Sequence, residues 1–70
     1  MYRFLVVIEK TDTGFSAYSP DLPGCIATGW TREETEKNMR EAIEFHVQGL
    51  LEDHLVIPES SSFAEYMAVA

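Results

Sequence analysis

The sequence predicts a two-layer α+β domain with the element order β-β-β-α-β. Three observations predict it: short alternating apolar segments come first, a helix-capping motif and an apolar stripe of helical period follow, and a last alternating segment ends the sequence. A length of 70 residues allows one domain, residues 1–70. A mostly antiparallel sheet with one helix packed on it would bury these apolar faces.

The first two strands are predicted to form an antiparallel hairpin. Residues 2–10 are rich in β-branched and aromatic side chains, and turn chemistry at residues 11–14 leads into a second strand at residues 15–19. Alternate residues of a strand point to opposite faces, so the helix can cover only one of them. The other face would hold Leu5, Val7 and Tyr18, which indicates that a second subunit covers it.

A proline-rich turn separates the hairpin from the third strand. Pro20 and Pro23 lack the amide donors that a ladder needs. Pro23 and Gly24 suit the two central positions of a type II turn, where proline presets φ and glycine supplies a positive φ. Residues 25–28 then read as a short third strand.

The helix has a clear start and a predicted end. Thr31 and Glu34 fit a capping box, with Thr31 at the N-cap and Glu34 bonding back to the cap amide. The helix should end near residues 53–55, before Pro58. Gly49 lies inside it, and we expect a close approach of the sheet or another helix there. The apolar stripe is formed by Met39, Ala42, Ile43, His46, Val47, Leu50 and Leu51.

The last segment, residues 63–69, alternates enough to predict a fourth strand. Phe63, Met67 and Val69 fall on one face, and Tyr66 lies on the other between two alanines. Glu65 falls among the larger apolar residues. This strand is therefore expected at an edge or an interface rather than in a fully buried position.

Composition narrows the classes of function. The net charge is −7, from 12 acidic against 5 basic residues, which disfavours direct binding of nucleic acid and favours a basic protein partner. The alternative is that the negative charge only keeps a small protein in solution. No apolar run is long enough for a membrane span or a signal peptide, and with a free cysteine this predicts a cytoplasmic protein. So short a chain is marginally stable. A single cysteine excludes an internal disulfide, and 1 cysteine with 2 histidines, at no metal-ligand spacing, disfavours a structural metal. We therefore expect a homo-oligomer, a dimer or higher, without a cofactor.

No combination of residues predicts an active site. A nucleophilic Cys25 with His46 or His54 as base lacks an orienting group, and a buried structural cysteine is the favoured interpretation. His46 lies on the apolar stripe, where a core histidine is expected. The scattered carboxylates of Glu9, Asp12 and Asp21 favour a solvated acidic surface over a metal-dependent hydrolase. We predict that the protein is not an enzyme.

The segment from Tyr18 to Cys25 carries a family resemblance. It reads YSPDLPGC, it follows a VVIEK opening at residues 6–10, and it precedes the TREE helix start at residues 31–34 and an Ala-Ile pair at residues 42–43. This pattern resembles the HicB-like antitoxins of bacterial toxin–antitoxin pairs, over about residues 2–51. The resemblance implies a partial ribonuclease-H-like fold without the catalytic carboxylates of the nuclease.

The resemblance also implies a partner: family members bind a small basic toxin that cleaves messenger RNA, and they block its active site. Longer members add a DNA-binding domain, which this sequence of 70 residues lacks, so promoter binding is not expected. A stand-alone oligomer with another binding role and, further behind, a small hydrolase are the alternatives. Trp30 is expected in the core, with an exposed interface anchor as the alternative. The residues proposed for the partner surface are Asp21, Leu22, Trp30, Glu33, Glu41 and Glu44, whereas Pro23 and Gly24 are explained as turn formers.

Overall fold

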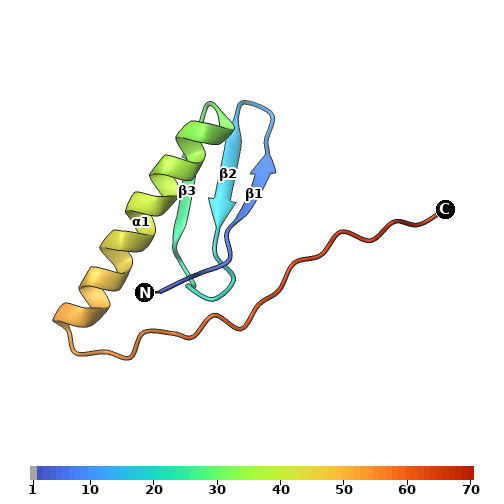
Figure 1. The fold of residues 1–70 in the computed structure, drawn as a ribbon. Coiled ribbons are helices and arrows are strands. Elements are labelled where there is room, and N and C mark those ends of the chain that lie inside the picture. The colour runs from blue at the N-terminus through green and yellow to red at the C-terminus, as the bar shows by residue number, and fades with distance from the viewer. Residues whose placement is uncertain (1) are drawn as a thin grey trace.

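The computed structural model describes residues 2–70 and has a three-stranded antiparallel sheet followed by one helix (Figure 1). Strand β1 spans Val7–Lys10, β2 Phe15–Tyr18 and β3 Ile26–Gly29, and helix α1 spans Arg32–Glu52. The strands pair in the order β1-β2-β3, so β1 and β3 are the two edges. The predicted α+β class is confirmed, and so is the order of the first four elements.

The helix covers the face of the sheet that carries the smallest side chains. Ile8, Ala17 and Ala27 stand opposite one another in the ladder and face α1. Two alanines at the centre of the row let the helix approach closely, and Met39 from α1 is 1% exposed in this contact. Because α1 lies mainly over β3 and β2, β1 is the strand that it covers least (Figure 1).

The other face of the sheet has no covering layer within residues 2–70. Val7, Tyr18 and Ile26 form a cross-strand row there, and Tyr18 and Ile26 are exposed. The next row toward the hairpin turn is polar, with Glu9 opposite Ser16. The expected position of Val7 and Tyr18 on the uncovered face is confirmed.

The helix start follows the predicted capping box with one change. The hydroxyl of Thr31 accepts a hydrogen bond from the Glu34 amide at 3.0 Å. The Glu34 carboxylate, however, accepts from the amide of Trp30 at 2.9 Å, not from that of Thr31. Thr35 is buried beneath this turn, and its hydroxyl donates to the Thr31 carbonyl at 2.7 Å. The first helical turn is thus tied to Trp30 and Thr31, the two residues that directly follow β3.

The helix ends where the sequence predicts. Asp53 is the C-cap, and His54 follows with a left-handed φ of 56°. The amide of Leu55 donates to the carbonyl of Leu50 at 2.9 Å and that of His54 to Leu51 at 3.1 Å, which is a Schellman motif. The expected close approach at Gly49 is wrong, because a side chain there would meet nothing within 4 Å. No helix in residues 2–70 is both long and apolar enough to cross a membrane.

The predicted fourth strand does not pair with the sheet. Residues 53–70 contain no strand, and residues 63–70, which we call the arm, run away from the domain past the β1 side (Figure 1). Phe63, Tyr66 and Val69 are each at least 90% exposed. The arm explains the long axis of 47 Å and a radius of gyration of 13.6 Å, against about 11 Å for a compact chain of this length. The predicted fourth strand is therefore wrong for this chain on its own, because a strand also needs a neighbour to pair with.

Candidate partner-binding surface

The turn between β2 and β3 has the predicted geometry but a different exposure. The amide of Cys25 donates to the carbonyl of Leu22 at 3.1 Å across Pro23 and Gly24, and Gly24 has a φ of 83°, as a type II turn requires. Leu22, proposed for the partner surface, is 0% exposed and packs in the core with Ala17 and Cys25. An exposed Leu22 is therefore wrong: the turn folds the side chain under the sheet and leaves its polar neighbours outside.

Asp21, next to Leu22, anchors the chain that follows the helix. Its carboxylate accepts hydrogen bonds from the hydroxyls of Ser60, Ser61 and Ser62 at 3.4, 3.1 and 3.0 Å. The amides of Ser61 and Ser62 donate to it as well, at 3.2 and 3.4 Å. We call this contact the serine clamp. It fixes the point from which the arm leaves the domain.

The clamp also sets the ionisation of Asp21. Desolvation alone would raise the pKa of its carboxyl, but the hydrogen bonds from the side chains and amides of Ser62 and Ser61 outweigh it and lower the pKa from 3.8. The carboxylate is therefore charged at neutral pH, and its oxygens accept the hydrogen bonds of the three serines. Its contribution to a partner surface would be indirect, through the position of the arm.

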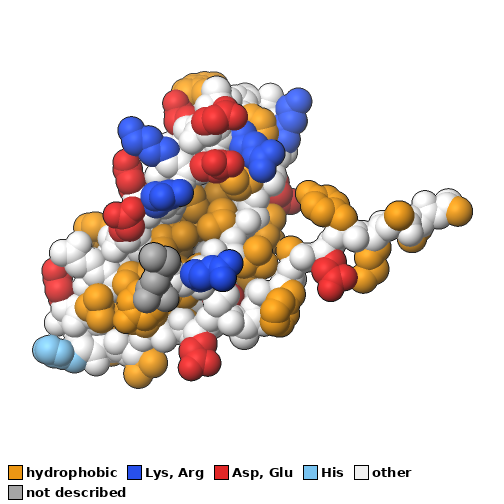
Figure 2. All heavy atoms as spheres, viewed as in Figure 1, with side chains coloured by type: hydrophobic (Ala, Val, Ile, Leu, Met, Phe, Trp, Pro, Cys, Tyr) orange, Lys and Arg blue, Asp and Glu red, His pale blue; other side chains and the backbone are white. Residues whose placement is uncertain are grey.

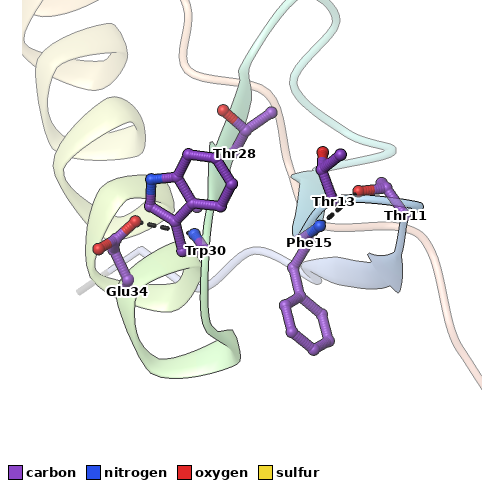
Figure 3. Close-up of a pocket in the computed structure, with 8 residues that line it drawn as sticks. Thr11, Thr13, Phe15, Thr28, Trp30 and Glu34 are labelled. Carbon is purple, nitrogen blue, oxygen red and sulfur yellow. Dashed lines mark hydrogen bonds between the residues drawn. The ribbon is translucent and has the colours of Figure 1, made fainter.

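Trp30 is exposed, which overturns the expectation that it packs in the core. Its side chain is 75% exposed, because the position that a helix staple would use holds the buried Thr35. Figure 3 shows Trp30 and Phe15 on either side of a shallow hollow of about 360 Å³ at the hairpin end of the sheet. The floor of the hollow is tight, since a side chain at Gly14 would collide with the Gly29 carbonyl oxygen.

The three glutamates proposed from the helix all lie on its solvent side. Glu33, Glu41 and Glu44 are exposed, and at 100° per residue they fall within about 80° of the helix circumference. Phe45, which the sequence reasoning did not single out, is 81% exposed next to them. Its signal was visible, since it is the aromatic residue that interrupts the polar side of the helix. Trp30 and Phe45 are thus exposed aromatic groups in an acidic setting.

A second apolar surface lies between the helix and the β1 edge. Figure 2 shows hydrophobic side chains gathered in this hollow, which we call the β1 groove. Its volume is about 630 Å³. The walls are Phe4, Val6 and Ile8 from one side and Met39 and Ile43 from the other, with Arg32, Glu36, Arg40 and Glu44 at the rim. The ion pair Arg32–Glu36, 3.3 Å between Nε and Oε1, occupies part of that rim.

The candidate nucleophile Cys25 lies inside the domain. Cys25 is 5% exposed, and burial raises the pKa of its thiol, which keeps it in the unreactive neutral form. The predicted buried position of Cys25 is confirmed. No cluster of three or more metal-ligating side chains occurs within residues 2–70.

Comparison with known families decides the class of this chain. The family model described as the HicB-like antitoxin of bacterial toxin–antitoxin systems matches residues 4–70. The chain belongs to the HicB-like antitoxin family. The resemblance seen in the turn and the helix start is therefore confirmed, and the match continues beyond residue 51 through the arm of this HicB-like chain.

Relatives of this HicB-like chain occur in several organisms. An uncharacterised 14.9 kDa protein of Haemophilus phage HP1 is 40% identical over 62 residues, which cover 89% of this chain and 47% of the phage protein. The chain thus spans about half the length of that relative. A UPF0150 protein of Synechocystis is 33% identical over 70 residues, 99% of this chain and 89% of the relative.

A solved structure of a HicA3 and HicB3 toxin–antitoxin complex contains a chain with the same fold. It superposes with a TM-score of 0.67 and 31% sequence identity, over 84% of this chain and 72% of that one. This similarity agrees with the family match in both sequence and structure.

Proposed function

We propose that this HicB-like chain acts as an antitoxin that binds a small basic toxin and covers its RNA-cleaving active site. The observation that carries the proposal is the similarity, at 31% identity, to a chain of a toxin–antitoxin complex. The net charge of −7 supports it independently, because an acidic protein is drawn to a basic partner and reaches it faster. A toxin that cleaves messenger RNA works in the cytoplasm, which is where we propose that the pair meets.

The solvent side of α1 is the surface that we propose for this contact. The helix carries six acidic and three basic side chains, and the acidic excess includes Glu33, Glu41 and Glu44. Trp30 and Phe45 supply exposed aromatic groups of the kind that dominate binding energy at interfaces. An acidic surface with aromatic anchors suits a basic patch on a small toxin. It would repel the phosphates of RNA or DNA, so we propose no direct contact of this surface with nucleic acid.

Binding rather than catalysis is the proposed mode of action. The neutral thiol of buried Cys25 is poorly placed to attack a substrate. A hydrolase would instead lose activity on Cys25→Ala substitution or on chelation of metal. Inhibition of a toxin by binding would survive chelation, and it would survive any substitution that leaves the fold and the α1 surface intact.

Association with a small basic toxin, sought as the product of a toxin-sized reading frame beside this gene, would test the proposed surface. Charge reversal by Glu41→Lys or Glu44→Lys should slow association several-fold at low salt and much less at moderate salt, because salt screens exposed charges. Glu59→Lys, which changes the charge equally on the segment after the helix, serves as the matched control. Trp30→Ala should raise Kd by about 30-fold, the effect of losing an interface anchor worth about 2 kcal/mol.

Two results would count against the proposed surface. One is equal slowing by Glu41→Lys and by the Glu59→Lys control, which would mean that only total charge matters. The other is an unchanged Kd for Trp30→Ala. No association of the pair at either salt concentration would count against the antitoxin role itself.

A further inference from the structure

The arm and the β1 groove are two apolar surfaces of the same chain, and no other element among residues 2–70 covers either of them. From Phe63 to Val69 the arm exposes four large apolar side chains, with exposed fractions of 92% for Phe63, 104% for Tyr66, 78% for Met67 and 90% for Val69. Extended, alternating and apolar segments of this kind are rare on the surface of a monomer. The family model matches residues 4–70, so the arm is part of the sequence pattern of the family.

We propose that the arm of one copy docks in the β1 groove of a second copy, pairing as an additional strand along β1, and that the exchange is reciprocal. The occupant is thus residues 63–69 of another molecule of the same chain. Homodimers with two-fold symmetry commonly form in this way, since each copy offers the segment that the other lacks.

Edge geometry selects β1 as the strand that receives the arm. Among residues 2–70, β1 pairs with β2 alone, so its outer backbone groups are free to bond another strand. The helix covers β1 least, which leaves the adjoining groove open. Residues 63–69 would extend about 23 Å as a strand, the same length as residues 4–10.

The two surfaces also match in chemistry. When Phe63, Met67 and Val69 point into the groove, they meet the apolar walls formed by Val6, Ile8, Met39 and Ile43. Glu65 then points the same way, toward the groove rim. Arg40 lies on that rim and makes no ion pair with any of residues 2–70. We therefore pair Glu65 of one copy with Arg40 of the other.

The serine clamp explains why the arm is offered to another copy. Ser60 to Ser62 are held on Asp21, so the arm begins at a fixed point at the end of the sheet and runs outward. Phe63, Met67 and Val69, the three apolar side chains that point into the groove, would each cover about 150 Å² per arm. Reciprocal exchange would cover about 900 Å² on the two arms, and the groove walls bring the total into the range of a specific interface, about 1,200–2,000 Å².

The oligomeric state of the full chain tests the exchange. Light scattering after size exclusion, over a range of concentrations, should give a dimer. Phe63→Asp with Met67→Asp should weaken the dimer by at least about 100-fold, because charges would enter an apolar groove. Val56→Asp, an equally exposed apolar position (88%) before the clamp, should leave the dimer intact.

A charge swap identifies the groove as the docking site without disturbing the core. Glu65→Arg alone and Arg40→Glu alone should each raise the dimer Kd by about tenfold, and the double variant should restore it. A wild-type chain that stays monomeric at every concentration would overturn the exchange, as would a dimer that survives the two aspartates in the arm. A double variant no tighter than the single ones would overturn the β1 groove as its site. A monomer whose arm is nevertheless protected from protease would show docking within one chain instead.

Discussion

The substitution Leu22→Ala tests whether Leu22 stabilises the hydrophobic core or contacts a partner. The side chain is 0% exposed, and its neighbours Ala17, Cys25 and Met39 are themselves buried. Removing a fully buried leucine costs about 2.7–5.0 kcal/mol in comparable cores. The flexible Met39 can partly fill the space, so we expect a loss near the lower end, about 3 kcal/mol.

A loss of this size is a large part of the stability of so small a domain. At about 0.05–0.15 kcal/mol per residue, a chain of 70 residues has a free energy of unfolding of about 3.5–10 kcal/mol. A loss of about 3 kcal/mol would lower Tm by about 12–24 °C. Thermal unfolding followed by circular dichroism, at one fixed protomer concentration, measures the shift.

The matched control is Leu55→Ala, because Leu55 is 56% exposed just after the helix. It should lower the free energy of unfolding by less than about 1 kcal/mol. A Tm of Leu22→Ala within a few degrees of the wild type, together with weaker association with the toxin, would refute the core role of Leu22. Leu22 would then be a contact residue, as the sequence first suggested.

Three further predictions follow from the helix and the clamp. Gly49→Ala should raise the free energy of unfolding by about 1 kcal/mol in urea titrations, since nothing lies within 4 Å of the added methyl group; destabilisation would reveal a close neighbour in the assembly. Thr31→Ala should lower it by about 1 kcal/mol through loss of the N-cap bond to the Glu34 amide, whereas Thr31→Ser should retain most of it. Because the pKa of Asp21 in the folded chain lies below its ordinary value of 3.8, the clamp should be complete above pH 3.8 and lost as pH falls through the lower folded pKa. At low pH the NMR chemical shifts of the Ser61 and Ser62 amides should approach those in the Asp21→Asn variant. Amide chemical shifts that stay unchanged through the acid titration would contradict the clamp.

Local chemistry explains the parts of the fold that the sequence predicts well. Pro23 and Gly24 define a turn within four residues, and Thr31 with Glu34 defines a helix start within the same span. These motifs involve only near neighbours, so their geometry follows from the residues themselves. The β1–β2 hairpin and the face that holds Val7 and Tyr18 follow from period-two alternation in the same way.

Positions that depend on distant contacts were less predictable. Leu22 lies between polar and turn-forming residues, and only the folded chain shows that the turn places it under the sheet. Trp30 is exposed because Thr35 takes the buried place beneath the first helical turn. The arm has the alternation of a strand, but its neighbour is not fixed by its own residues. The serine clamp joins residues about 40 apart in the sequence, a pairing that a single sequence does not reveal.

Inhibition of toxin-catalysed RNA cleavage tests the central claim most directly. A fixed amount of a small basic RNA-cleaving toxin, sought as the product of a toxin-sized reading frame beside this gene, would be titrated with the purified chain. Cleavage of a labelled RNA would be followed at each step. The antitoxin role predicts that cleavage falls in proportion to added chain and ends near stoichiometric equivalence, and that Trp30→Ala shifts the curve to higher concentrations. Full cleavage at a large excess of folded chain would contradict it.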